Sequence, residues 1–304
     1  MPHILAPLTG RTTRCILFDL GSTLWTYRDD NTVKQAELKA EQRAFAVLRR
    51  HLNPQDAARL ETLAPYQLGK AIYANIIQDE QPGTGIYTEP DVARATVAGL
   101  KQLGFPDVSP AIGAEVFEAM RLRIPETRAF FNDALPTLAA LKACGFKLGI
   151  VTNRGHGGEA FREDLETIGF SDYIGPRNIA VSIDLNIRKP DSRIFQYTLD
   201  ALEVSAAESV MVGDQLGADV YGAQHLGIYG VWKPNPRIFA EARDEAGMQS
   251  NENLPPLGTL KRIALSRMKH YRPDRATLEA LQPDMVIEHL RELLDVFVKV
   301  GTQE

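Results

Sequence analysis

Short apolar runs without intervening polar residues recur near the start of the chain and through its second half. Strands buried on both faces of a parallel sheet have this pattern, because helices cover both faces. Five runs fit it: residues 15–18, 148–151, 179–181, 210–212 and 228–232. Helical patterns at 133–144, 158–168 and 191–202 separate the later runs, and Gly145 and Gly169 stop the first two of them. The alternation of strand and helix predicts an α/β fold with a doubly wound parallel sheet.

Residues 30–127 interrupt this alternation with helical patterns alone. Helices are predicted over 33–52, 56–77, 90–103 and 110–122. In the first of them Leu38, Phe45 and Leu48 recur at helical spacing, so they lie on one face. We therefore predict that residues 1–29 and 128–304 form a Rossmann-like α/β core. Residues 30–127 are predicted to form an all-helical domain inserted after its first strand.

A further segment follows the last predicted strand, over about residues 234–283. It contains a polar loop at 249–253 and a basic stretch at 261–275, which carries six Lys or Arg and one Asp. Two interpretations of the basic stretch stay open: a solvated helix face, or a docking surface for an acidic partner or a large anionic substrate. An amphipathic helix is predicted over 285–298.

Composition limits the classes of partner. The chain has 34 Lys and Arg against 39 Asp and Glu, a formal net charge of −5 at pH 7, so we expect no nucleic-acid partner. No apolar run approaches the ~18 residues of a membrane-spanning helix, and the first residues lack the pattern of a signal peptide. Cys15 and Cys144 are expected to be buried, reduced thiols. These features predict a cytoplasmic protein with no membrane partner, and they do not indicate an oligomeric state.

Candidate chemistry lies at the ends of the predicted strands, where open α/β sheets bind ligands. Asp19 follows the first strand and Thr152 follows the second. Asp214 and Asp219 follow the fourth, and Lys189 precedes a helix. Two carboxylates can share Mg²⁺, which prefers oxygen ligands, while a lysine and a hydroxyl neutralise the other oxygens of a phosphoryl group. The set therefore has the parts of a covalent mechanism with a carboxylate nucleophile.

With these candidate residues in this order along the chain, the sequence resembles the haloacid dehalogenase superfamily. The matching motifs read FDLGSTL at 18–24, IVTN at 150–153, RKPDSRIF at 188–195 and VGDQLGAD at 212–219. The resemblance covers about residues 14–233 and the closing helix, and the helical insertion is similar to the family's C1-type cap. It implies a hydrolase, in the first place a phosphatase that acts on a small phosphorylated metabolite.

The resemblance also implies a nucleophile and a cofactor. Asp19 would attack phosphorus and form an aspartyl-phosphate. Mg²⁺ would be held by the carboxylates of Asp19 and Asp214 and by the backbone carbonyl of Gly21.

The other matched residues would act on the phosphoryl group and the substrate. Thr152 and Lys189 would bind the phosphoryl group that is transferred. Asp219 would orient Lys189 or a metal-bound water, and Asn153 would face the substrate or the cap.

One position departs from the family pattern. Most phosphatases of the family carry a second aspartate two residues after the nucleophile, which protonates the leaving group, whereas this chain has Gly21. Loss of a general acid costs about 10²–10⁴-fold in rate. Two explanations are compatible with phosphatase activity despite the missing aspartate. Either the substrate has a good leaving group, or Tyr27, Asp29 or His156 supplies the proton. The alternatives are a catalytically silent phosphate-ligand-binding or scaffold protein, and a dehalogenase-type or phosphonatase-type hydrolase.

Overall fold

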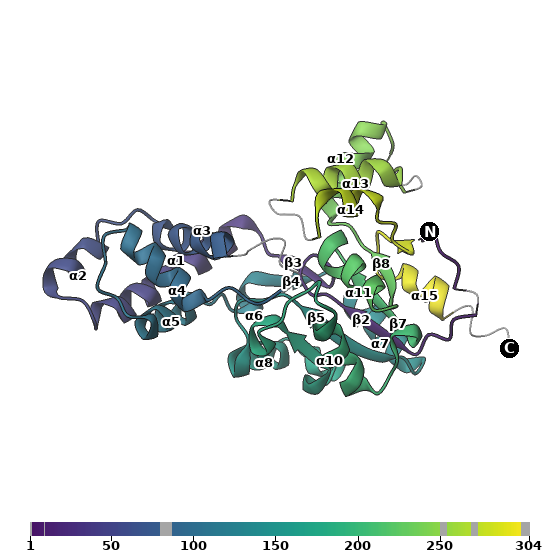
Figure 1. Cartoon of the computed structure of the whole chain (residues 1–304), viewed down its shortest axis with the longest axis horizontal. Helices are drawn as coiled ribbons and strands as arrows, with labels where there is room; N and C mark the ends of the chain where they lie inside the picture. The colour runs from purple at the N-terminus through teal and green to yellow at the C-terminus, as the bar shows by residue number, and fades with distance from the viewer. Residues whose placement is uncertain (1, 9, 80–86, 250–253, 269–272, 299–304) are drawn as a thin grey trace.

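A seven-stranded sheet forms the core of the computed structural model (Figure 1), which describes residues 2–8, 10–79, 87–249, 254–268 and 273–298. The strand order is β1-β9-β8-β7-β2-β5-β6, and all neighbours are parallel except β1 and β9. The strands are β1 (His3–Ile4), β2 (Cys15–Phe18), β5 (Lys147–Thr152), β6 (Ile179–Val181), β7 (Ser209–Gly213), β8 (Tyr229–Trp232) and β9 (Met285–Val286). The predicted α/β fold with a doubly wound parallel sheet is confirmed, and β1 and β9 extend the sheet beyond the prediction.

Helices cover both faces of this sheet. The side chains of β2 alternate between two hydrophobic clusters, with Ile16 and Phe18 in one and Cys15 and Leu17 in the other. The first cluster is covered by α7 (Ala134–Ala143), α8 (Gly158–Thr167) and α15 (Glu292–Phe297), and the second by α10 (Ser192–Leu202) and α11 (Gly222–His225). A short helix, α9 (Ser182–Leu185), follows β6. Burial on both faces explains why the strands appear in the sequence as uninterrupted apolar runs.

The chain between β3 (Trp25–Tyr27) and β4 (Arg128–Phe130) forms a helical region, which Figure 1 shows beside the sheet. Its helices are α1 (Asp30–Arg49), α2 (Pro54–Leu60), α3 (Gln67–Asp79), α4 (Val92–Gln102), α5 (Pro110–Ala119) and α6 (Ile124–Thr127). Leu48, Leu68 and Phe105 belong to a hydrophobic core of this region's own. Strands β3 and β4 pair as an antiparallel ribbon where the chain leaves the core and returns to it.

The predicted single helix over 56–77 is wrong, because the structure divides this stretch into α2 and α3. Pro65 lies between them and lacks the N–H that a continuous helix needs. Tyr66 has a φ of 66°, in the left-handed region, which also excludes a continuous right-handed helix there.

The predicted helix over 285–298 is wrong in its first half. Met285 and Val286 form β9, which pairs with β8 on one side and with β1 on the other, and α15 begins at Glu292. This pairing buries both residues, so sheet formation overrides the helical pattern of the sequence.

The segment after β8 forms the helices α12 (Pro236–Ala246), α13 (Leu257–Ser266) and α14 (Arg275–Ala280), which stand above the sheet in Figure 1. A hydrophobic cluster that includes Trp232, Phe239 and Ile263 joins them to the core. The described cations of the basic stretch have these partners: Arg262 pairs with Glu245, Arg267 with Glu241, Arg275 with Glu279, and Lys261 donates to the carbonyls of Glu279 and Leu281. Residues 250–253 and 269–272 lie outside the described residues. Lys261 is buried, whereas Arg262, Arg267 and Arg275 are exposed and paired with nearby glutamates, which favours a solvated helix face over a docking surface.

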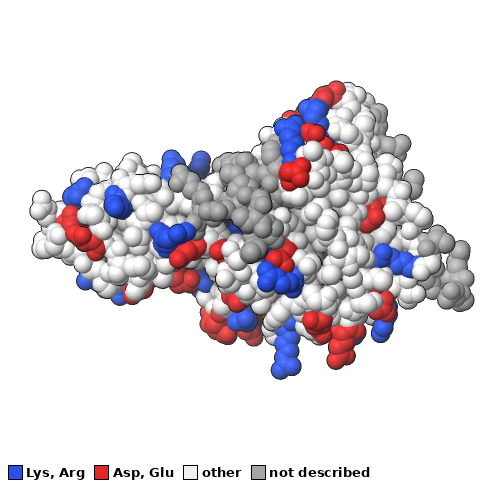
Figure 2. All heavy atoms as spheres, in the orientation of Figure 1, with Lys and Arg blue, Asp and Glu red and all other residues white. Residues whose placement is uncertain are grey.

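The surface carries both signs of charge, which are interspersed on the face shown in Figure 2. Within the described ranges, no helix combines the length and the apolar character needed to cross a membrane. Cys15 is buried, which raises its thiol pKa to about 12, whereas Cys144 is exposed. The expectation of two buried thiols is therefore wrong for Cys144, because it occupies the C-cap position just after α7.

Candidate active site

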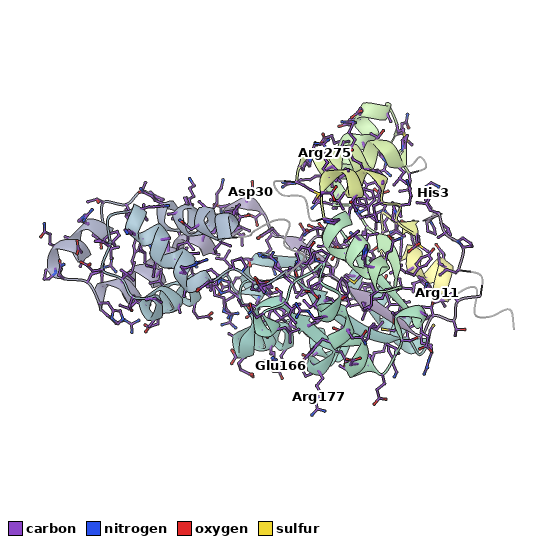
Figure 3. All side chains as sticks on the ribbon, viewed as in Figure 1. His3, Arg11, Asp30, Glu166, Arg177 and Arg275 are labelled. Atoms are coloured by element: carbon purple, nitrogen blue, oxygen red, sulfur yellow. The ribbon has the colours of Figure 1, made fainter. Side chains whose placement is uncertain are left out.

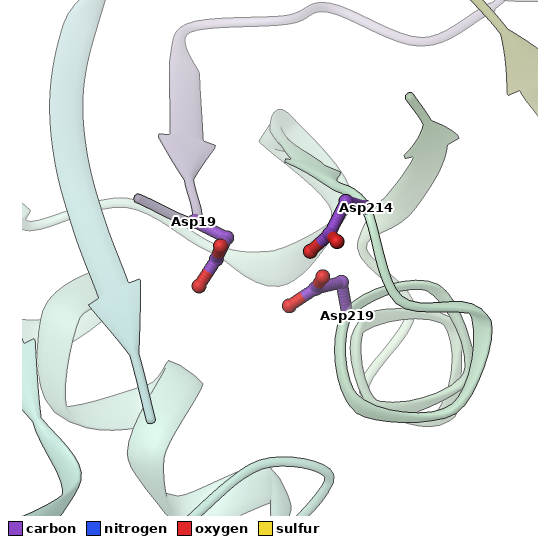
Figure 4. Close-up of side chains that lie close together, drawn as sticks. All are labelled: Asp19, Asp214 and Asp219. Atoms are coloured by element: carbon purple, nitrogen blue, oxygen red, sulfur yellow. The ribbon is translucent and has the colours of Figure 1, made fainter. Parts of the chain in front are cut away.

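Three carboxylates converge at the carboxyl edge of the sheet, as Figure 4 shows for Asp19, Asp214 and Asp219. Asp19 follows β2 and Asp214 follows β7, and the ends of these strands meet because they are parallel neighbours. Asp219 lies in the π-helical turn Leu216–Tyr221 that comes next in the chain. One oxygen from each carboxylate lies within 4.8 Å of the other two. Gly213 permits this approach, because a Cβ at that position would lie 2.2 Å from Cγ of Asp219.

A buried lysine balances part of this negative charge. Lys189 is 3% exposed, and its Nζ donates to Oδ1 of Asp19 at 2.7 Å, to Oδ1 of Asp219 at 2.6 Å and to a backbone carbonyl at 2.7 Å. Burial disfavours the ammonium, but Asp19 and Asp219 outweigh it and raise the pKa of Lys189 above its ordinary value. Lys189 is therefore a fixed positive charge between two carboxylates.

The cluster carries more negative charge than Lys189 can balance. Burial, together with Asp19 and Asp219, raises the pKa of Asp214 well above its ordinary value. Burial also raises the pKa of Asp219 to about 6, although Lys189 acts in the opposite direction. Oδ1 of Asp214 is shielded from solvent and has no hydrogen-bond partner among the described residues. An unpartnered buried carboxylate oxygen is costly, so this donor set fits a divalent cation that prefers oxygen ligands.

The end of β5 supplies a hydroxyl and an amide. Thr152 is the last residue of β5 and is buried. Asn153 comes next, and its side chain binds the backbone of Lys189 at two points. Its Nδ2 donates to the Lys189 carbonyl at 3.0 Å, and its Oδ1 accepts from the Lys189 N–H at 2.8 Å. The structure thus makes Asn153 a clamp on the loop that carries Lys189.

A cavity of about 210 Å³ opens between these groups. Of the seven residues to which the sequence analysis gives a catalytic, substrate-binding or metal-binding role, six line it: Asp19, Gly21, Thr152, Asn153, Lys189 and Asp214. Asp219, the seventh, lies against Lys189 and completes the cluster. The same cavity is lined by residues that the sequence analysis missed, among them Arg128 and Arg154.

Gly21 has no side chain at the position where the family resemblance places a general acid, and a Cβ built there meets no atom within 4 Å. Of the three candidate replacements, Tyr27 lines the cavity. Asp29 instead accepts hydrogen bonds in the first turn of α1, whose N-cap it forms. His156 stacks on Phe117 of the helical region, with ring centroids 4.2 Å apart. Tyr27 is therefore the candidate of the three that the structure places at the site.

The loop that carries Gly21 is held by two further residues that the sequence analysis missed. Lys233 donates through Nζ to the carbonyl of Ser22 at 3.2 Å, and Asn235 donates through Nδ2 to the Ser22 hydroxyl at 2.9 Å. Burial lowers the pKa of Lys233 to about 8. Lys233 directly follows β8 and Asn235 comes two residues later, in the sequence KPNP. Their position just after a strand end is the signal that could have found them.

Comparison with protein families matches residues 100–233 to a family described as haloacid dehalogenase-like hydrolase. This range contains Thr152, Lys189, Asp214 and Asp219, whereas Asp19 precedes it.

Comparison with known proteins finds both phosphatases and a dehalogenase. The glyceraldehyde 3-phosphate phosphatase of Pyrococcus abyssi is 33% identical over 101 residues, which are 33% of this chain and 40% of that protein. The (S)-2-haloacid dehalogenase 1 of Pseudomonas sp. (strain CBS-3) is 31% identical over 132 residues, 42% of this chain and 55% of that protein. The matches thus span between 40% and 55% of these relatives.

Among solved structures, the putative HAD-hydrolase YfnB of Bacillus subtilis bound to magnesium has a TM-score of 0.52 with this chain. The identity is 20%, and the match covers 94% of this chain and 99% of that chain. At this identity the likeness shows a common fold.

Proposed function

We propose that this chain, whose residues 100–233 match the haloacid dehalogenase-like hydrolases, is a Mg²⁺-dependent phosphatase of a small phosphorylated metabolite. The observation that carries the proposal is Lys189, which lies 2.7 Å from Asp19 and 2.6 Å from Asp219, beside the unpartnered Oδ1 of Asp214. Phosphoryl transfer needs a nucleophile and fixed positive charge around the phosphoryl oxygens, and this cavity offers both. The name of the Pyrococcus abyssi relative supports the same activity.

Asp19 is the nucleophile in the proposed reaction. One of its carboxylate oxygens attacks phosphorus, and the leaving oxygen departs with the bonding electrons and takes a proton from water or a nearby acid. Lys189 and Thr152 bind the non-bridging oxygens and stabilise their negative charge. Water then attacks phosphorus of the aspartyl-phosphate and loses a proton, so that inorganic phosphate is released and the Asp19 carboxylate is restored. Asp219 positions Lys189 through their 2.6 Å hydrogen bond.

Mg²⁺ would be held by the carboxylates of Asp19 and Asp214 and by the carbonyl of Gly21, all three of which line the cavity. The closeness of the three carboxylates and the unpartnered Asp214 oxygen support this assignment. When bound, the ion supplies positive charge to the phosphoryl oxygens.

Magnesium is expected to raise the thermal stability of the folded protein. A ligand that binds the folded state alone adds about 2.7 kcal/mol of stability at 100 times its Kd. Asp214→Asn removes a proposed ligand and should lose most of this gain. Asp29→Asn is the matched control, because Asn caps a helix as well as Asp does. Calorimetric melting in Mg²⁺ and in EDTA measures the effect, and an equal gain in Asp214→Asn would contradict the ligand assignment.

We further propose that residues 30–127 act as a cap that selects the substrate, on a core of residues 1–29 and 128–304. The separate hydrophobic core of the helical region supports this division, and its contacts with the loop after β5 support its role as a cap. Phe117 stacks on His156, and Nη2 of Arg121 donates to the carbonyl of Gly157 at 2.9 Å. These contacts join the cap to the loop that follows Thr152.

We also propose that the protein acts in the cytoplasm.

Gly21→Asp is expected to increase turnover of an alkyl phosphate more than that of an aryl phosphate. An alkoxide leaving group needs a proton, so a restored general acid should accelerate its departure by about 10²-fold or more. A Cβ at position 21 meets no atom within 4 Å, so the substitution causes no clash at the backbone. The measurement is kcat/KM for a sugar phosphate and for p-nitrophenyl phosphate. Equal changes for the two esters would argue against a missing general acid.

Phosphate release from the same two esters, with and without Mg²⁺, tests the proposed function. Turnover of the aryl ester alone indicates a natural substrate with a good leaving group. Turnover of both indicates another proton donor, and Tyr27→Phe should then slow the sugar phosphate selectively. A silent binding protein releases phosphate from neither ester. A dehalogenase, the activity in the name of the Pseudomonas relative, would instead release halide from an (S)-2-haloacid.

A further inference from the structure

Two arginines form a second centre of positive charge in the cavity. Arg128 is the first residue of β4, and Arg154 lies two residues after the end of β5. Apart from burial, the charge that acts most strongly on Arg154 is that of Arg128. Both guanidinium groups line the cavity that Asp19 and Asp214 also line.

Neither guanidinium forms an ion pair with a carboxylate in the described parts of the chain. Nε of Arg154 donates to the carbonyl of His156 at 3.0 Å, and Arg128 donates to the carbonyl of its preceding residue at 3.4 Å. Asp164, which attracts Arg154, is itself paired with Arg123. Burial, with the repulsion from Arg128, lowers the pKa of Arg154 to about 10. Two guanidinium groups that line one cavity, and that have no paired carboxylate among the described residues, create a site that an anion would stabilise.

Aromatic rings hold both guanidinium groups in place. The guanidinium carbon of Arg128 lies 3.6 Å from the ring centroid of Tyr27, and that of Arg154 lies 4.7 Å from the centroid of Phe161. Stacking on a ring fixes the plane of a guanidinium and leaves its N–H edges available to a ligand. Such edges match the paired oxygens of a carboxylate or a phosphate.

We propose that Arg128 and Arg154 bind a second anionic group of the substrate, which is a small phosphate monoester that also carries a carboxylate or a second phosphate. This inference rests on the proposed phosphatase function, because the first anionic group is the phosphoryl group at Asp19 and Lys189. One cavity of about 210 Å³ is lined by both centres, so a short linker joins the two anionic groups.

Titration calorimetry of the full chain in Mg²⁺ tests the inference with three probes that are not hydrolysed. Propylphosphonate carries one anionic group, 3-phosphonopropionate adds a carboxylate, and 1,3-propylenediphosphonate adds a second phosphonate. A second group that binds both arginines should tighten binding roughly ten- to hundredfold over propylphosphonate. The doubly anionic probe that binds more tightly shows whether the second anionic group of the substrate is a carboxylate or a phosphate.

Variants assign this difference to the arginines. In the double variant Arg128→Gln/Arg154→Gln the affinity ratio between doubly and singly anionic probes should fall close to one. Arg154→Lys keeps the charge without the planar fork and should retain part of the ratio. Arg177→Gln is the control, because Figure 3 shows Arg177 pointing away from the molecule, and the ratio should stay at the wild-type value. Circular dichroism checks that each variant is folded.

Two results would overturn the inference: no preference for doubly anionic probes in the wild type, or an unchanged affinity ratio in the double variant. An unchanged ratio with equal weakening of all three probes would show that the arginines bind the phosphoryl group itself. Because the probes are not hydrolysed, this readout does not depend on turnover. Failure of the phosphatase proposal appears separately, as absence of phosphate release from any ester.

Discussion

Asp19→Asn is expected to reduce Mg²⁺-dependent phosphate release by at least about 10³-fold while the protein stays folded. An amide cannot form the acyl-phosphate, and removal of a nucleophile from a cooperating catalytic group costs up to ~10⁶-fold in kcat. Lys189 keeps its bonds to Asp219 and to the Val151 carbonyl, so the rest of the site should hold its geometry. The measurement is kcat with p-nitrophenyl phosphate, alongside the melting temperature.

Asp29→Asn provides the control for this variant. It makes the same chemical change ten residues further along the chain, at the N-cap of α1, and should leave kcat at the wild-type value. Mass spectrometry must confirm that the asparagine introduced in the Asp19→Asn variant has not deamidated back to aspartate. Activity of Asp19→Asn within tenfold of the wild type would then rule out Asp19 as the nucleophile.

Lys189→Met is expected to lower the free energy of unfolding in EDTA by about 3–5 kcal/mol, because it leaves buried carboxylates without their cation. Asp19 and Asp219 each lose a hydrogen bond shorter than 3 Å. Mg²⁺ should reduce the loss, since the ion supplies the missing positive charge. Denaturant unfolding with and without Mg²⁺ measures both effects, and turnover should be lost in parallel.

A second substitution separates the electrostatic cause from a packing defect. Lys189→Met/Asp219→Asn removes one of the stranded carboxylates and should recover part of the stability that Lys189→Met loses. If Lys189→Met alone costs less than ~1 kcal/mol, the lysine does not hold the cluster together. No recovery in the double variant would assign the loss to packing.

The closeness of the acidic side chains could be predicted from the sequence, because it depends mainly on where the strands end. Asp19 and Asp214 each follow an apolar run, and the α/β pattern alone places the ends of such strands at one edge. Lys189 follows no predicted strand. Its place before a predicted helix made it a candidate, and its assignment to the phosphoryl group came from the resemblance to a family. The structure adds the reason for its position, the clamp that Asn153 forms on its backbone.

The arginine pair could not be predicted in this way, because each member depends on tertiary contacts. Arg128 belongs to a three-residue strand that forms by pairing with β3, from the other end of the helical region. The sequence pattern places Arg154 in a loop, and the orientation of its side chain depends on the ring of Phe161 in the following helix. The error over 285–298 has the same origin, since pairing with β1 and β8 decides the structure of Met285 and Val286.

Borohydride trapping during turnover tests the proposed chemistry most directly. Hydride reduces an aspartyl-phosphate to an alcohol with release of phosphate, so a phosphorylated Asp19 becomes homoserine, which peptide mass spectrometry detects. Catalysis through Asp19 predicts homoserine at this position when aryl phosphate and Mg²⁺ are both present, and none when either is omitted. An unmodified Asp19 in enzyme that is quenched during rapid Mg²⁺-dependent phosphate release would contradict catalysis through this residue.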